Sequence, residues 1–160
     1  MPSGALANFF HERRKTLTWG QVIGAAMPAG FAGDIARGEF DFTTETRVND
    51  ATAPVLAFGV PVKFTSTGAV SPATAAADVV GFSVRIYGQA DMSSVQAEKV
   101  LTILRRGYFF AAVAGTPAVN GTVYMAADGS LTAASSGTAI PGAVFVGPAV
   151  DGLAEIAYKI

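Results

Sequence analysis

Two stretches of this chain share one pattern of strands and turns, and this pattern constrains the fold more than any other feature. Residues 59–86 and 121–146 each contain a short apolar strand, a tight turn ending in glycine, a second strand and, after a looser connection, a third. Either the two units are copies, or unrelated hairpins use the same residues because turns favour glycine and strands favour valine. Under both interpretations the chain is built from hairpins.

The segment 39–48 alternates more regularly than any other. Phe40, Phe42 and Val48 fall on one face of an extended strand, with threonines between them. The opposite face carries Glu39, Asp41, Thr43, Glu45 and Arg47. Such alternation predicts a half-buried strand whose outer, acidic face is a candidate contact surface.

Further strands are expected where β-branched and aromatic residues lie between turn signals, at 60–64, 69–70, 79–86, 143–146 and 154–158. Residues 100–110 could be helical by periodicity, but their composition and Gly107 favour two strands around a turn or bulge. Asn120-Gly121, Asp128-Gly129 and Asp151-Gly152 predict tight hairpin turns. These features predict an all-β fold, a jelly-roll-like sandwich or small barrel, as a single domain over residues 17–160.

The composition indicates a protein that works in an assembly. Only 14% of the 160 residues are charged, against roughly 25% in ordinary soluble domains, and 51% are hydrophobic. The longest uncharged run near the start, residues 16–33, is interrupted by Pro28 and several glycines, which argues against a membrane span. A chain with so few charges is expected to bury surface against protein partners, including other copies of itself as a dimer or trimer.

A net charge of −1 argues against a dedicated nucleic-acid partner, which would normally have a basic stripe. Residues 108–110, three aromatics beside Arg105 and Arg106, could stack bases, but we favour a core strand there.

Residues 1–16 have a composition of their own and predict an extended N-terminal arm. Phe9 and Phe10 would be costly to leave in water, because burying each contributes about 1.5–3 kcal/mol. They either fold back onto their own domain or dock on a neighbour, and we favour the neighbour. Because arginine and aromatic side chains dominate interface energetics, the candidate contact residues on or near the arm are Phe9, Phe10, Arg13, Arg14 and Trp19.

No residue pattern predicts catalysis, a cofactor or a metal site. The chain has no cysteine and one histidine, His11, and Lys15 stands where a zinc protease motif needs its second histidine. Glu39, Asp41 and Glu45 would lie about 7 Å apart in adjacent pairs along a strand, a spacing that glycosidases also use. The sequence offers few aromatic platforms for a sugar, so a solvated or interfacial face is the preferred interpretation.

Several short motifs resemble the capsid cement (decoration) proteins of tailed bacteriophages. They are Met27-Pro-Ala-Gly-Phe-Ala-Gly-Asp34, the strand 39–48, Ala57-Phe-Gly-Val-Pro-Val62, Leu104-Arg-Arg-Gly-Tyr108 and Gly121-Thr-Val-Tyr-Met125. The resemblance covers most of residues 20–160 and leaves out the arm.

The resemblance implies a jelly-roll-like or barrel-like domain without catalytic residues. It would sit on the outer face of the virion, where it binds the major capsid protein and stabilises the shell against the pressure of the packed genome. Two other functions are open: another phage virion component, such as a tail or adsorption part, and a carbohydrate-binding or hydrolytic β domain that uses the acidic strand face.

Overall fold

The computed structural model describes residues 30–37, 41–85 and 99–160. The strands are β1 (Thr43–Val48), β2 (Pro61–Phe64), β3 (Val70–Pro72), β4 (Gly81–Val84), β5 (Val100–Ala114), β6 (Thr122–Met125), β7 (Leu131–Thr132), β8 (Thr138–Phe145) and β9 (Leu153–Tyr158). A single 3-10 turn, Ala76–Asp78, is the one helical element among the described residues. The all-β prediction is confirmed, and its small-barrel form is the one observed.

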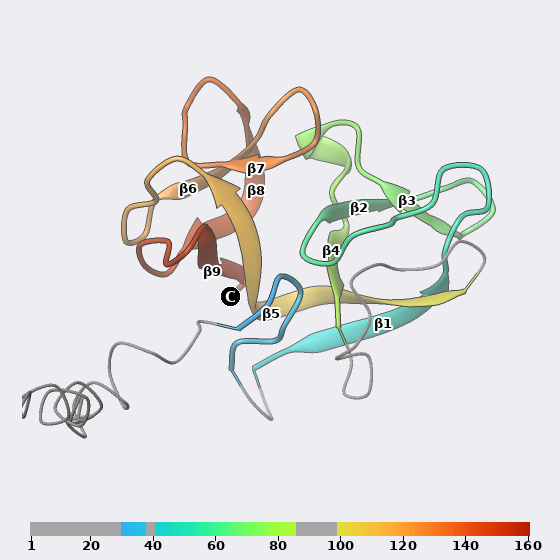
Figure 1. Ribbon diagram of the computed structural model, residues 1–160. Coiled ribbons are helices and arrows are strands. Elements are labelled where there is room, and N and C mark those ends of the chain that lie inside the picture. The colour runs from blue at the N-terminus through green and yellow to red at the C-terminus, as the bar shows by residue number, and fades with distance from the viewer. Residues whose placement is uncertain (1–29, 38–40, 86–98) are drawn as a thin grey trace, which may run out of the picture.

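The second half of the chain forms a closed five-stranded barrel (Figure 1). Its strands follow the order β5-β7-β6-β8-β9, and β9 returns to pair with β5 over residues 107–112. The β5–β7 pairing is parallel and joins Val113 to Leu131 and Ala114 to Thr132, whereas the other ladders are antiparallel. Closure leaves this barrel without an unpaired sheet edge.

The first half is built in the same way but closes less completely. β1 and β4 pair with the N-terminal half of β5, and β2 joins β4 to β3. The circle from β3 back to β1 is completed by one isolated parallel bridge between Asn49 and Val70. We call residues 41–106 the first unit and residues 107–160 the second unit.

The two repeats expected from the sequence lie at corresponding places in these units. In residues 59–86, β2 pairs with both β3 and β4, and in residues 121–146, β6 pairs with both β7 and β8. Whether this shared pairing reflects duplication of one ancestral unit stays a prediction.

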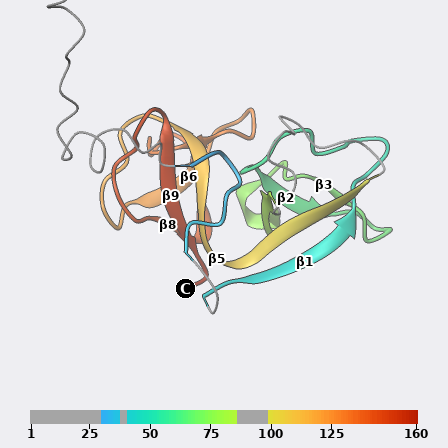
Figure 2. The same cartoon turned by 60° about the horizontal axis from the view of Figure 1, so that its bottom comes forward.

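β5 belongs to both units, because it bends where one ends and the other begins. The strand runs for 15 residues, and Gly107 near its middle has a φ of 137° that other residues rarely adopt. A side chain there would also meet Phe42, whose Cβ lies 2.7 Å from the ideal Cβ position. The sequence predicted two strands separated near Gly107, but the structure has one strand that bends and changes partners there (Figure 2).

The main hydrophobic core joins the two units. Phe82 of β4 lies 4.5 Å from Phe109 and 5.0 Å from Tyr158 between ring centroids, and all three side chains are buried. The Tyr158 hydroxyl donates a hydrogen bond to the Val79 carbonyl over 3.2 Å. A smaller core within the first unit contains Val55, Phe58, Val62, Val70, Leu101 and Ile103. The shared aromatic cluster should make the two units unfold together.

The half-buried strand expected at 39–48 is wrong in its extent and in its burial. β1 begins at Thr43, and Phe42 and Val48, expected to be buried, are 36% and 53% exposed. Glu45, expected on the outer face, is the least exposed residue of the strand. It pairs in register with the buried Ile103, and directly opposed residues share one face of a sheet. Glu45 therefore lies on the sheet face that carries the buried Ile103, while Thr43 and Arg47 on the same face are exposed.

Candidate contact surface

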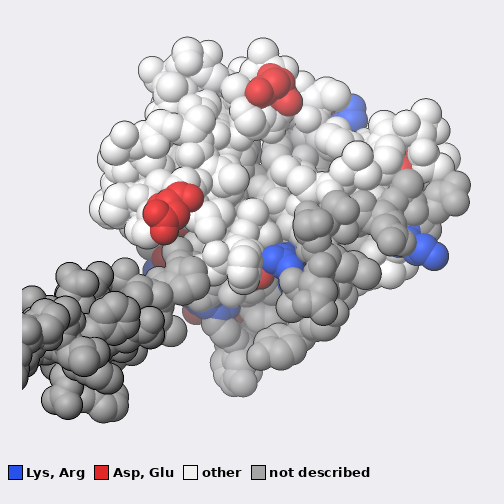
Figure 3. Space-filling model, in the orientation of Figure 1, with Lys and Arg blue, Asp and Glu red and all other residues white. Residues whose placement is uncertain are grey.

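The low charge of the chain is concentrated in the second unit. Residues 107–150 contain one charged residue, Asp128, whereas the similarly long stretch 41–85 contains seven. The face of the barrel visible in Figure 3 is almost entirely uncharged, apart from isolated acidic groups. Depletion of charged residues distinguishes the core of a protein interface from the rest of a protein surface.

Exposed valines lie within this charge-poor stretch of the second unit. Val144 of β8 is 39% exposed and pairs across the sheet with Thr122. Val119 is 63% exposed in the turn before β6, which is held against β8 because the Asn120 N–H donates to the Phe145 carbonyl over 2.8 Å. We call Val119, Thr122 and Val144 the neutral patch. Short side chains lose little rotamer freedom when a partner covers them, so such a patch is suited to protein contact.

Sequence reasoning missed the neutral patch, although a signal for it was present. The composition predicted a protein rich in contacts, but the expected contact residues were placed on the arm and on the acidic strand. The uninterrupted uncharged runs on either side of Asp128 could have directed attention to residues 107–150.

The expected acidic face is instead a cluster of mixed charge. Glu45 accepts a hydrogen bond from Arg47 Nε over 2.6 Å, and Arg105 Nε lies 4.0 Å from its other oxygen. Both guanidinium groups lie over the Phe64 ring, each 5.2 Å from its centroid. A β-bulge between Thr43 and Thr44 leaves Arg105 as the extra residue on β5. Two arginines thus surround the one carboxylate at the edge of the first unit, so the cluster is net positive.

The other expected site residues are placed differently or lie outside the described residues. Asp41 is exposed and precedes β1, while Glu45 is held by arginines, so the structure does not bring these two carboxylates together as a free pair. The remaining ones lie outside the described ranges: Phe9, Phe10, Arg13, Arg14, Trp19 and Glu39.

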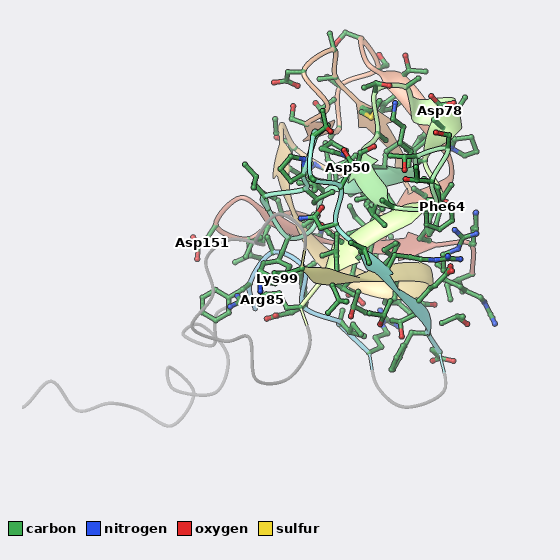
Figure 4. All side chains as sticks on the ribbon, turned by 90° about the vertical axis from the view of Figure 1, so that its right-hand side faces the viewer. Asp50, Phe64, Asp78, Arg85, Lys99 and Asp151 are labelled. Atoms are coloured by element: carbon green, nitrogen blue, oxygen red, sulfur yellow. The ribbon has the colours of Figure 1, made fainter. Side chains whose placement is uncertain are left out.

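An open groove of about 730 Å³ lies on the first unit, where Asp50, Phe64 and Asp78 form part of its lining (Figure 4). Its polar groups already have partners in part. The Asp50 carboxylate accepts from the N–H groups of Thr52 and Ala53, at 3.1 and 2.8 Å, and Lys63 donates to Thr74 over 2.8 Å. Single-sequence patterns could not reveal this groove, because strand pairing brings its lining residues together.

The ionisable groups with shifted pKa values are exposed and locally paired. The Asp128 pKa is lowered because its carboxylate accepts from the Ser130 hydroxyl over 2.6 Å and from the Ser130 N–H over 3.0 Å. The Arg37 pKa is raised by its 2.6 Å hydrogen bond to Glu155. Within the described ranges, no three His, Cys, Asp or Glu side chains gather as a metal site would need. Across those same ranges, no helix has the length and apolarity to cross a membrane.

The charge-poor surface of this small β-barrel has the composition of the core of a protein interface. Comparison with protein families shows to which family of proteins the chain belongs. The family model described as structural cement protein (E217 gp24/Pam3 gp6) matches residues 20–159, and the chain therefore belongs to this family of phage structural proteins. This agrees with the resemblance found in the motifs and makes the protein a structural component of the phage capsid.

Among solved structures, the chain is similar to the head fiber gp8.5 N base of bacteriophage phi29, with a TM-score of 0.49 and 12% sequence identity. The similarity covers 72% of this chain and 94% of that chain. The comparison with curated proteins finds no match.

Proposed function

We propose that this protein binds the outer face of the major capsid protein shell and holds neighbouring shell subunits together against the pressure of the packed genome. Membership of the cement family supports the capsid setting. The observation that supports attachment through a particular surface is the neutral patch, on a barrel with one charged residue in residues 107–150. No reaction is needed for this role, because the protein acts by contact.

The proposed contact contributes a modest binding free energy for each copy, and the many copies on a shell together contribute a large one. A standard protein interface buries about 1,600 Å² in total, and full burial of one valine contributes about 1.5–3 kcal/mol. Repeated sites on a lattice add avidity, because a linked second contact forms at high effective concentration. Introducing a charge into the neutral patch should be costly, since the bound state would bury it without a partner.

The test is binding to shells that lack the protein, measured by co-sedimentation at increasing protein concentration. Val119→Glu should weaken binding at least tenfold because the carboxylate becomes buried unpaired. Leu56→Glu is the matched control, since Leu56 is 58% exposed in the first unit and Val119 is 63% exposed in the second. Equal binding by both variants, with unchanged circular dichroism, would contradict attachment through the patch. Electron microscopy of labelled particles locates the bound protein on the shell.

The N-terminal arm is proposed as a second attachment element. The argument rests on the sequence of residues 1–16, with Phe9, Phe10, Arg13 and Arg14 as contacts and Trp19 just beyond. Deleting residues 1–16 should weaken shell binding and leave the unfolding midpoint of the β domain unchanged. A deletion that unfolds the domain would instead assign both phenylalanines to its own core.

A further inference from the structure

Residues 30–37, which we call the strap, lie beside β5 where the two units meet. The Gly33 N–H donates to the Phe110 carbonyl over 2.7 Å, and the Ala36 N–H donates to the Tyr108 carbonyl over 2.9 Å. Because β9 already pairs with this part of β5, the strap lies antiparallel along the other edge of the strand. Figure 2 shows the strap in blue beside β5, between the two units.

The strap fills the interval between β4 and β7 on this edge of β5. Arg85, the residue after β4, donates its N–H to the Gly33 carbonyl over 2.8 Å. Farther along β5, the Ala114 carbonyl accepts from the N–H of Ala133, the residue after β7, over 3.0 Å. Between these two points, the Ile35 side chain packs against the main core. The strap therefore completes the pairing of β5 across the junction of the two units.

Two glycines allow the strap to approach the first unit closely. Gly33 has a φ of 86°, and a Cβ added to it would lie 2.5 Å from the Cβ of Phe58. Gly59 has a φ of 75°, and a Cβ added there would lie 3.0 Å from the Gly33 nitrogen. A carbon–carbon contact of 2.5 Å is far inside the van der Waals distance. A side chain at Gly33 would therefore push the strap away from the first unit.

Side chains hold both ends of the strap. Near its start, the Asp34 carboxylate accepts from the Phe31 N–H over 2.8 Å and closes a turn. At its end, Arg37 Nε donates to Glu155 over 2.6 Å, and the guanidinium lies 4.3 Å from the Tyr108 ring centroid. Together with the backbone bonds, these contacts fix the point at which the preceding residues are joined to the junction.

We infer that the strap fixes the origin of the N-terminal arm at the junction between the two units, with Gly33 and Arg37 as positioning residues. The inference rests on the proposed attachment through the arm, residues 1–16. With the strap in place, 13 residues, 17–29, separate the arm from it. If the strap were released, 24 residues, 17–40, would separate the arm from the rest of the protein. The effective concentration of a tethered group falls roughly as the −3/2 power of tether length, here by about 2.5-fold.

Hydrogen exchange of the full-length protein tests whether the strap holds its place in solution. Gly33→Ala should accelerate exchange at the Ala36 and Phe110 amides about tenfold or more, because the strap leaves β5. Gly152→Ala is the matched control, since Gly152 has a similar φ of 78° but an added Cβ meets nothing within 4 Å. This control should instead affect Val113, whose N–H donates to Gly152 over 2.9 Å. Equal acceleration at Ala36 and Val113 in Gly33→Ala, or an unprotected Ala36 amide in the parent, would overturn the inference.

A second variant, Arg37→Ala, keeps the test decisive if Gly33→Ala does not fold. Loss of the ion pair and of the ring contact should accelerate exchange at Ala36 about threefold, a small effect because both contacts are exposed. Lys159→Ala is the control, because it removes another exposed cation, whose Nζ lies 4.8 Å from the Tyr158 ring centroid and outside the strap. Equal exchange rates at Ala36 in these two variants would contradict the positioning role of Arg37.

A double-mutant cycle on shell binding tests what the strap does for the arm. Gly33→Ala should weaken binding about 2.5-fold in the parent background. In a full-length Phe9→Ala/Phe10→Ala background, whose arm contacts are removed, it should have no effect. Equal weakening in both backgrounds would show that the strap acts without the arm and would refute the inference. If Phe9→Ala/Phe10→Ala alone leaves binding unchanged, the proposed attachment through the arm fails, whereas hydrogen exchange still decides whether the strap is fixed at the junction.

Discussion

The two units of this protein pair their strands in the same way, yet they present different surfaces to their surroundings. In the second unit a two-residue parallel ladder between β5 and β7 completes the barrel. In the first unit the equivalent place holds the single Asn49–Val70 bridge, which leaves β1 with an open edge. The closed unit has one charged residue, Asp128, in residues 107–150 and four in residues 107–160, whereas the open unit carries most of the charges.

This comparison shows how one strand arrangement can serve two kinds of contact. A closed barrel has no free backbone groups at an edge, so it can bind partners only through side chains, and the neutral patch offers small apolar ones. In the first unit, no described residue pairs with the outer edge of β1 between Thr43 and Arg47.

The largest effect is expected where the two units share their core. Phe82→Ala removes a fully buried ring from between Phe109 and Tyr158 and should cost about 3–5 kcal/mol in the free energy of unfolding. Denaturant unfolding followed by circular dichroism should still show one transition, because both units lose packing. Phe42→Ala, at a partly exposed ring, is the control and should cost much less. Two separated transitions in the variant would show that the units are independent.

A smaller effect, confined to the first unit, is expected at Asn49. Its buried side chain accepts from the Val55 N–H over 2.8 Å and donates to the Val55 carbonyl over 2.9 Å. Asn49→Ala leaves both backbone groups unsatisfied and should cost about 1–3 kcal/mol. Hydrogen exchange should accelerate at Val55 and Asp50 more than in the β5–β7 ladder.

The exposed Asn120→Gly is the control, because glycine tolerates the φ of 59° at that position. Equal acceleration of exchange in both units after Asn49→Ala would mean that the Asn49 side chain does not set the local stability of the first unit.

The smallest effect is expected at Asp128, on the second unit. Ser130→Ala removes the hydroxyl that lowers the Asp128 pKa, so this pKa should rise toward its ordinary value. A lowered pKa adds stability above the ordinary pKa of the group, and this stability is lost as the pH falls through the folded-state value. The variant should therefore be slightly less stable near neutral pH and equal to the parent in strong acid. A carboxyl NMR titration checks the pKa, with the exposed Ser136→Ala as control.

Much of the local structure could be predicted from the sequence, because turn residues and β-branched runs act locally. Asp151-Gly152 forms the expected turn, with φ values of 51° and 78°, and β8 pairs with β9 across it. Which strands pair with each other could not be predicted from local sequence in this way. Asn120-Gly121 was expected to form a hairpin turn, but β5 before it pairs with β7 and β9 and not with β6. Such partners are chosen by packing over long sequence separations.

The site was harder to predict than the fold. Alternation in 39–48 correctly indicates a strand, but alternation does not say which face meets the core. β1 turns Glu45 and Arg47 toward the side of Ile103, where Phe64 and Arg105 receive them. The contact residues expected on the arm lie outside the described residues and stay predictions.

The continuity of β5 has a mechanical consequence. A tensile load applied between the two units would travel along this strand, since it is common to both. Ladder hydrogen bonds lie across the strand direction, so such a load would strain the bonds of several pairs in shear at once rather than peel them apart one by one. A shell component that is stretched as its container fills would gain resistance to rupture from this arrangement.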